Sequence, residues 1–508
     1  MTDFKFSLLS KVPEEVNYDA LDDMAGAIYD LSLDQAVHEF CTAKKQVEYF
    51  LDVLKAPLHH VENVRYRQSV LKDLLQNPQL LADLNRLFKR YDTIQDDWKE
   101  MRANVYSFGV NVSKRALLEF TFSQLQVTAK FAKMIIGYFR SLNELLEPYQ
   151  LTSEGLCGIR QYCADMIAND SFQEIVDISS HFLHYTPDHY EFSVTATVDD
   201  SLRLCISDLC EAIDLTSKGK VNPLKKFFQA RKNTEKPAPE VKIPGEEDED
   251  ADFMLNEAMH RMYTVLTDIT NNVYELFYGL SRELMFYNVA VAYCAYIQEH
   301  GMTACMPTVL DASRDVFDAK DLYDFLLLSE GKTPDQIICN DVHMDAECDG
   351  VLIRGLNSSG KTVFLRSMGI AQILAQSGLP VCAKSARISV RDAIFTQFSS
   401  AEKDFKVGDT AGRFEGEVQC ISHIMDRLRP HALVLLNETF QTTAYAEGTR
   451  AIYDILSFLP LAHAKFVFVT HLTHLYELCN PDHVQLMQSD REGPNRFKIL
   501  PADLSGIK

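Results

Sequence analysis

The sequence predicts a multi-domain protein: an all-helical N-terminal region followed by a C-terminal α/β region. Apolar residues recur at helical spacing through about the first 300 positions. From about residue 310, short apolar runs alternate with helical segments, and a glycine-rich turn joins one such run to a helix. The chain has 508 residues, enough for roughly two to four domains with full hydrophobic cores.

The N-terminal region is predicted to be helical almost throughout. The stretches "LDQAVHEFCTAKKQVEYFLDVL" and "RYRQSVLKDLLQNPQLLADLNRLFKRY" carry apolar residues at helical spacing, and Asn77-Pro78 marks a turn between two helices. The pattern continues from about 112 to 230, where Cys205 and Cys210 form a C-x4-C pair on an expected helix. If residues 253–299 form a single helix, that helix would span about 70 Å.

Residues 233–252 have the composition of a linker, with three prolines and the acidic run Glu246 to Asp250. A basic patch precedes this acidic linker. It comprises Lys218, Lys220, Lys225, Lys226, Arg231 and Lys232. Two interpretations stay open for the patch: a solvated helix end, or a contact point for a polyanion such as nucleic acid.

Composition narrows the possible functions. The net charge of −22 argues against broad electrostatic binding of nucleic acid, because phosphate contacts need Lys and Arg. We find no apolar run of about 18 residues and no signal-peptide pattern at the start, so we expect a cytoplasmic protein without a membrane span. The twelve cysteines are scattered without paired CxxC units. We therefore expect reduced thiols rather than a zinc site.

The C-terminal region contains four strand-like runs. These are "GVLIRG", "DAIFTQF", "ALVLLNE" and "KFVFVTH", separated by helical segments. Strands that alternate with helices predict a mostly parallel sheet with helices on both faces.

The turn "GLNSSGKT" matches the pattern G-x-x-x-x-G-K-[ST] and has a strand before it and a helix after it. Glycines let backbone N–H groups curl around phosphate oxygens, and the helix N-terminus adds its positive dipole end. We expect Lys361 to bridge the β- and γ-phosphates and Thr362 to bind Mg²⁺. The predicted nucleotide-binding residues are Gly355, Asn357, Ser358, Ser359, Gly360, Lys361 and Thr362.

Two further strands end in residues suited to hydrolysis. "ALVLLNE" runs into Asn437, where a metal-holding aspartate is expected, and into Glu438, which is placed to orient or deprotonate the attacking water. "KFVFVTH" ends in His471, which could sense the γ-phosphate or serve a structural role; as the third member of an ordered set we favour the first. We predict Glu438 and His471 as catalytic residues, with Thr362 and Asn437 at the metal.

These motifs resemble those of the MutS family of DNA mismatch-repair ATPases, relatives of the ABC class. "GLNSSGKT" is similar to the family's G-P-N-M-G-G-K-S, with the internal asparagine kept at Asn357. "LPVCAKSARISVRDAIFTQFSSAEKDF", "LVLLNETFQTT" and "FVTHLTHLYEL" match other family segments, and "NDVHM" lies where the family has N-D-V/I. The resemblance is strong over about 335–480 and weak in the helical half.

The resemblance implies an ABC/MutS-type P-loop NTPase domain, with ATP and Mg²⁺ as ligands and a homodimer formed through these domains. It also implies the domain division: a core-like helical domain over 1–110, a long-helix lever over 111–310 with the linker at about 233–252, and the ATPase domain over 311–508.

The sequence departs from the family pattern at several points. We find no counterpart of the mismatch-recognition and connector domains, and the chain stops at "LSGIK", about where the family's terminal helices begin. Asn437 replaces an aspartate, which predicts weak Mg²⁺ binding and slow hydrolysis. Ile337 and Ile338 stand where the family stacks the adenine on an aromatic ring. In "GRFEGEVQCISHIM", similar to a segment with S-T-F-x-x-E, Gly412 replaces the serine that reaches the partner's site, and Arg413 either acts there or forms a surface salt bridge.

Two functions remain open. The first is an ATPase that dimerises and clamps DNA or a related nucleic acid, without reading mismatches. The second is a nucleotide-switched binding protein with little turnover, acting on a protein or ribosomal partner. An ABC-type transporter ATPase fits poorly, because "TAGRFEGE" does not supply an LSGGQ-like signature.

Overall fold

The computed structural model describes residues 6–12, 18–104, 114–170, 173, 190–198, 204–214, 249–398, 410–440, 445–490, 492–493 and 495–502. The chain divides into two compact units. One comprises Met1–Phe6, Asn77–Thr152 and Leu156–Ser281; the other comprises Ser7–Gln76, Ser153–Gly155 and Arg282–Lys508.

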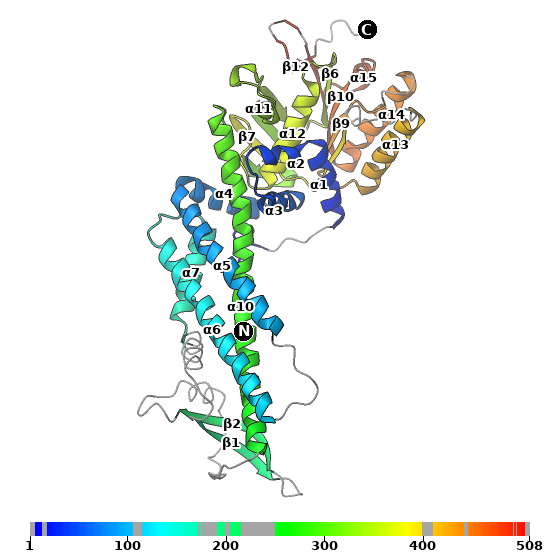
Figure 1. The fold of residues 1–508 in the computed structure, drawn as a ribbon. Helices are drawn as coiled ribbons and strands as arrows, with labels where there is room; N and C mark the ends of the chain where they lie inside the picture. The colour runs from blue at the N-terminus through cyan, green and yellow to red at the C-terminus, as the bar shows by residue number, and fades with distance from the viewer. Residues whose placement is uncertain are drawn as a thin grey trace. The chain divides into compact units, whose positions relative to one another are not determined.

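The first unit is built mainly from long helices. They are α5 (Pro78–Asn104), α6 (Lys114–Leu146), most of α7 (Glu154–Ala168) and the first part of α10 (Glu249–Glu299). Aromatic side chains join them: Tyr91 of α5 stacks on Tyr274 of α10 with ring centroids 5.5 Å apart, and Phe139 of α6 meets Phe277 edge-on at 5.0 Å. Figure 1 shows α10 as one continuous helix, which confirms the prediction for residues 253–299.

Two strands in the first unit correct a prediction. β1 (Tyr190–Val198) pairs antiparallel with β2 (Leu204–Asp214), whereas we expected helix over this part of the chain. Cys205 and Cys210 therefore lie on a strand. The reason is local: "YEFSVTATV" alternates polar and apolar residues and is rich in β-branched ones, and period-2 alternation buries one face of a strand.

The predicted linker and basic patch fall largely outside the described residues. Helix α10 already begins at Glu249, so residues 249–252 of the predicted linker are helical. Residues 233–248 lie outside the described part of the chain, as do Lys218, Lys220, Lys225, Lys226, Arg231 and Lys232.

The second unit contains a six-stranded sheet in the order β12-β11-β6-β10-β9-β8. The strands are β6 (Gly350–Gly355), β8 (Ile394–Phe398), β9 (Leu433–Asn437), β10 (Lys465–Thr470), β11 (Val484–Ser489) and β12 (Ile499–Pro501). All neighbours pair in parallel except β12, which runs antiparallel to β11. The prediction of a mostly parallel sheet is confirmed, with the four expected strands side by side.

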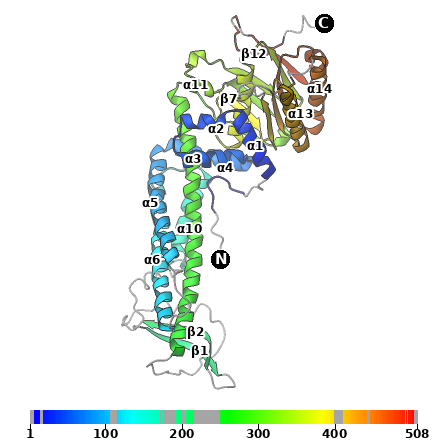
Figure 2. The same cartoon turned by 45° about the vertical axis from the view of Figure 1, so that its right-hand side comes forward.

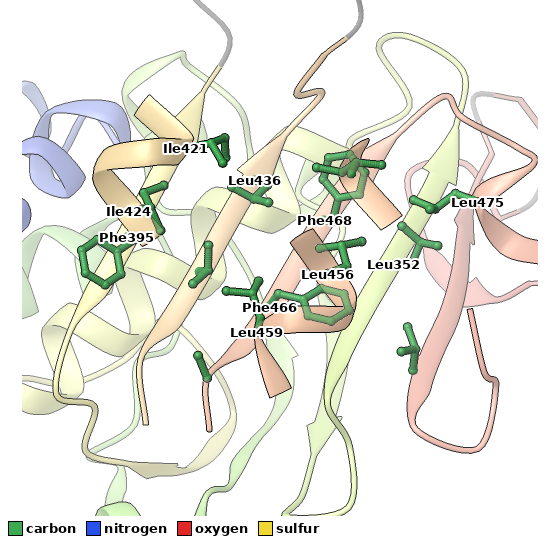
Figure 3. Packing of buried hydrophobic residues seen from close by; sticks show 14 of the residues in the cluster. Leu352, Phe395, Ile421, Ile424, Leu436, Leu456, Leu459, Phe466, Phe468 and Leu475 are labelled. Atoms are coloured by element: carbon green, nitrogen blue, oxygen red, sulfur yellow. The ribbon is translucent and has the colours of Figure 1, made fainter. Parts of the chain in front are cut away.

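Helices cover both faces of this sheet. They are α12 (Lys361–Gln376), α13 (Thr410–Arg427), α14 (Tyr445–Phe458) and the short α15 (Leu475–Leu478). Val434 and Leu436 of β9 pack with α13 and α14 in one buried cluster (Figure 3). Leu435 points to the opposite face, where a Cβ added at Gly369 of α12 would lie 2.7 Å from it. This glycine therefore allows close packing of α12 on the sheet.

A smaller four-stranded sheet adjoins the large one, in the order β3-β7-β4-β5. The strands are β3 (Thr308–Leu310), β4 (Phe317–Leu322), β5 (Asn340–Met344) and β7 (Ser385–Ser389), with the short helix α11 at Leu326–Ser329. Short 3₁₀ turns occur at Val37–Glu39, Ala312–Arg314, Pro334–Gln336 and Pro460–Ala462. Asn340 ties β5 to the large sheet, because its Oδ1 accepts a bond from Ile499 N at 2.8 Å.

N-terminal helices belong to this same unit (Figure 2). They are α1 (Tyr18–Asp30), α2 (Leu33–Ala36), α3 (Lys44–Lys55) and α4 (Val61–Gln76), and α5 starts at Pro78, as the Asn77-Pro78 turn predicted. Thr396 of β8 donates to Asp30 at 2.8 Å, and Asp23 lies 3.2 Å from both His423 and Arg427 of α13. The two compact units are each made of segments that are not consecutive in the chain. Their limits therefore differ from the predicted boundaries at residues 110 and 310, which cut the chain into consecutive domains.

Candidate nucleotide-binding site

A glycine-rich loop, residues 355–362, connects β6 to α12 at the carboxyl end of the parallel strands. A Cβ added at Gly355 would lie 2.5 Å from the carbonyl oxygen of Ser489 and 2.8 Å from Ser359 Oγ, so only glycine fits there. Gly360 caps the N-terminus of α12 with φ +93°, a left-handed conformation that favours glycine. The loop thus presents the free N–H groups of a helix start, a ready anion site.

Ser359 is the buried residue of this loop. Its side chain is 1% exposed, and its Oγ has no hydrogen-bond partner among the described residues. The neighbouring Leu356, Asn357 and Ser358 are exposed. A buried hydroxyl without a partner is unfavourable unless a ligand completes it. An oxygen-rich group such as a phosphate, held over this loop, would do so.

Lys361 lies buried beneath the loop, 3% exposed. Its Nζ donates to the carbonyl oxygens of Gly355 at 2.8 Å and Leu356 at 2.9 Å, and lies 3.7 Å from Glu438 Oε1. Burial lowers the pKa of Lys361, and the carboxylate of Glu438 opposes that shift. The ammonium group is therefore held at the loop, where it can meet an anion.

Thr362 and Asn437 bring two oxygen atoms together at the first turn of α12. The Thr362 hydroxyl donates to Asn437 Oδ1 at 3.2 Å. Both are neutral oxygen donors of the kind that Mg²⁺ accepts, but neither supplies negative charge. The two oxygen atoms therefore suit a hard cation such as Mg²⁺ whose charge is balanced by groups other than these two residues.

Glu438 and His471 face each other at the ends of β9 and β10. Glu438 Oε1 lies 2.7 Å from His471 Nε2, an ion-pair distance without the geometry of a hydrogen bond. Glu438 has φ 57°, a left-handed conformation that is uncommon outside glycine. The structure thus places Glu438 beside Lys361, and His471 beside Glu438.

The remaining predicted positions are only partly described. Gly412 and Arg413 lie in the first turn of α13, and the surroundings of both residues are outside the described part of the structure. Ile337 is buried at 5% exposure.

Sequence reasoning overlooked several residues around the loop. Ser489 Oγ donates to the carbonyl oxygen of Ser359, and Phe497 lies beside Gly360, with its Cβ 3.4 Å from a Cβ added there. Glu417 of α13 accepts from the backbone N–H of Phe440. Only Glu417 had a sequence signal, as the final glutamate of "GRFEGE". Ser489 and Phe497 lie outside the motifs and reach the loop only through the fold.

Comparison with known families agrees with this arrangement. The sequence model of MutS domain V matches residues 351–495, and that of the MutS2 N-terminal domain matches residues 59–300. Both matches are to one family and together take in most of the chain. The chain belongs to the MutS family. The first match contains the loop, Asn437, Glu438 and His471; the second contains α4 to α7 and α10.

Individual MutS-family relatives match about a quarter of this chain. The DNA mismatch repair protein MutS of Porphyromonas gingivalis (strain ATCC BAA-308 / W83) is 34% identical over 145 residues, 28% of this chain and 16% of the relative. Endonuclease MutS2 of Streptococcus pneumoniae serotype 19F (strain G54) is 31% identical over 139 residues, 27% of this chain and 18% of the relative. The chain thus matches less than a fifth of each relative's length. Among the described helices, none combines the length and apolar character needed to cross a membrane.

Proposed function

We propose that this MutS-family chain is a P-loop NTPase that binds ATP with Mg²⁺ at residues 355–362 and hydrolyses it slowly. One observation carries the proposal. Lys361 and Glu438 meet 3.7 Å apart at the carboxyl ends of β6 and β9, next to the buried Ser359 hydroxyl that lacks a partner among the described residues. A cation, a carboxylate and an open helix N-terminus are the parts that phosphoryl transfer to water requires.

Each residue has a defined role in this proposal. Lys361 exchanges its bonds to the loop carbonyls for bonds to phosphate oxygens, which strengthens them because the new partner is charged. Thr362 and Asn437 hold Mg²⁺, which neutralises charge on the phosphates when bound. Asn357 and Ser358 complete the exposed rim of the loop.

Glu438 orients the attacking water and accepts its proton, and His471 faces the γ-phosphate. In the structure Glu438 is held between Lys361 and His471. When Lys361 turns to phosphate, one of these two contacts is released, and the carboxylate becomes available to water.

We also propose that the chain dimerises through this domain and clamps DNA or a related nucleic acid without mismatch reading. Family membership supports this, since matched relatives are named as a DNA mismatch repair protein and an endonuclease. Gly412 or Arg413 would reach the partner's site, the long helices of residues 111–310 would act as levers, and the basic patch at 218–232 would contact phosphates. Because Lys and Arg would make these contacts to phosphates, binding should weaken as the salt concentration rises.

A binding experiment tests the nucleotide site. Equilibrium titration of the full chain with a fluorescent ATP analogue, with and without Mg²⁺, should give saturable binding that Lys361→Ala removes. Equal binding by wild type and Lys361→Ala would overturn the site.

A gel-shift assay with branched, mismatched and plain duplex DNA tests the nucleic-acid partner. The proposal expects ATP-dependent binding at low salt, with no preference for the mismatch. If no DNA is bound at low salt with ATP present, the clamp proposal is wrong.

The second candidate is a nucleotide switch with little turnover, read by a protein or ribosomal partner. Asn437 favours it, because an uncharged amide binds Mg²⁺ more weakly than an aspartate. Under this alternative ATP still binds, but wild type and Glu438→Ala hydrolyse it equally slowly.

A further inference from the structure

Residues 438–440 form a turn after β9 in which three consecutive residues are each held by a different element. The N–H of Glu438 donates to the carbonyl oxygen of Val469 in β10 at 2.8 Å. The Thr439 hydroxyl donates to Gln397 Oε1 of β8. The N–H of Phe440 donates to Glu417 Oε2 of α13 at 2.8 Å. We call this segment the β9 turn.

The β9 turn has a backbone that needs such support. Glu438 and Phe440 both adopt left-handed conformations, with φ 57° and 64°. Residues with a Cβ disfavour this region and stay there only when surrounding contacts hold them. The side chain whose position depends on this backbone is Glu438, the carboxylate at the nucleotide site.

Glu417 is the one charged group among these three contacts. It is 6% exposed, so its carboxylate has lost most of its water and gains from a backbone N–H donor. Its neighbour Glu415, two residues earlier on α13, is exposed. The two glutamates thus form a natural pair for comparison: one holds the turn and the other faces solvent.

We propose that Glu417 is a positioning residue for ATP hydrolysis: through its bond to Phe440 N it holds the β9 turn in the left-handed conformation that aims Glu438 at the nucleotide. This inference rests on the proposed function. It assigns Glu417 no contact with ATP.

Steady-state ATP hydrolysis and equilibrium ATP binding of the full chain test the inference together. Glu417→Ala should lower kcat at least about tenfold and leave the ATP Kd within about threefold, because a displaced catalytic group costs rate rather than binding. Glu417→Gln keeps an oxygen acceptor and should stay within about threefold of wild type in kcat. Glu415→Ala should match wild type.

Hydrogen–deuterium exchange supplies a readout that does not require turnover. A peptide covering residues 433–440 should exchange faster in Glu417→Ala and at the wild-type rate in Glu417→Gln, while peptides from β6 and β10 stay unchanged. If Glu417 only stabilises the fold, Glu417→Ala should instead raise deuterium exchange across the whole sheet. It should also weaken ATP binding by about the same factor by which it lowers kcat.

The outcomes separate the two proposals. If Glu417→Ala keeps wild-type kcat, or exchange in the 433–440 peptide does not change, the positioning role is overturned. If wild type itself shows no turnover while the peptide responds as expected, the proposed hydrolysis fails, and the hold of Glu417 on the β9 turn stands without a catalytic purpose.

Discussion

The two ends of helix α12 bury polar side chains in opposite ways. At its C-terminal end, the side chain of Gln376 forms hydrogen bonds with other parts of the chain. Its amide NH₂ donates to the carbonyl oxygens of Leu58 at 3.1 Å and Arg391 at 3.0 Å, and its amide oxygen accepts from Arg391 N. Just before its N-terminal end, Ser359 Oγ lacks a partner among the described residues. Lys361, the first residue of α12, donates to two loop carbonyls and lies near Glu438.

Burial alone therefore does not identify a functional residue. Gln376, Ser359 and Lys361 are all nearly inaccessible. Gln376 stabilises the fold through bonds to distant parts of the chain, whereas Ser359 lacks a partner among the described residues and Lys361 bonds mainly to its own loop, so these two side chains suit a ligand. Changes at the loop end should therefore affect ATP binding, and changes at the other end should affect stability.

The largest effect is expected for Lys361→Ala. Loss of a charged donor to phosphate should weaken ATP binding at least about 100-fold. The melting temperature should stay equal or rise, because a buried cation with a lowered pKa is removed. Titration with ATP and thermal melting check both expectations. Lys384→Ala, which changes an exposed lysine, is the control; a large loss of stability in Lys361→Ala would contradict the contrast.

Away from α12, the buried Glu283 of α10 should make stability depend on pH. Burial raises the pKa of Glu283 to about 7 from an ordinary value of 4.5, although Ser7, Leu8 and Arg67 act in the opposite direction. The folded state therefore keeps a proton that the unfolded chain loses. Stability from this group is complete below about pH 4.5 and falls by about 3 kcal/mol as pH rises through 7. Urea unfolding across this range should show the fall, and Glu283→Gln should flatten it.

Gln376→Ala should lower stability by roughly 2–4 kcal/mol, because it leaves Arg391 N and two buried carbonyls without their partner. ATP affinity should stay within about threefold of wild type. Chemical unfolding and ATP titration measure the two quantities. Gln79→Ala removes an exposed side-chain bond to Asp83 and should cost less than about 0.5 kcal/mol. Similar losses of stability in Gln376→Ala and Gln79→Ala would contradict the proposed difference between the two ends of α12.

The smallest effect is expected for Asn437→Asp. The new carboxylate lies beside the Thr362 hydroxyl and should raise apparent Mg²⁺ affinity about five- to tenfold, with faster ATP turnover. The Mg²⁺ dependence of hydrolysis is the measurement. An unchanged Mg²⁺ dependence would show that Asn437 does not face the metal.

Local sequence patterns predicted the centre of the site. β6, β9 and β10 are short apolar runs that end in chemically distinct residues, and the loop motif fixed the position of Lys361. Contacts between residues far apart in the sequence were not predictable, because such contacts produce no periodic pattern in the sequence. Thr396 bonds Asp30, 366 positions away, and Gln376 bonds Leu58, 318 positions away. Such contacts place α1 to α4 in the unit of the parallel sheet.

The hairpin of β1 and β2 was missed for a different reason. Its strands lie inside a region of helical patterns, and "LCISDLCEAID" carries apolar residues that fit either period. The β9 turn was also hidden, because the left-handed conformations of Glu438 and Phe440 follow from bonds to three other elements. The part of the site that sequence could not supply is thus the part that aims Glu438.

We propose above that this site binds ATP and hydrolyses it through Glu438. Single-turnover hydrolysis of radiolabelled ATP, with enzyme in excess, measures it most directly for wild type and Glu438→Ala. We expect slow hydrolysis by wild type, at least about 100-fold faster than by Glu438→Ala, with both proteins fully bound to ATP. Equal hydrolysis rates for the two proteins at full ATP occupancy would contradict the role of Glu438 in hydrolysis. The nucleotide-switch function would then be the better explanation.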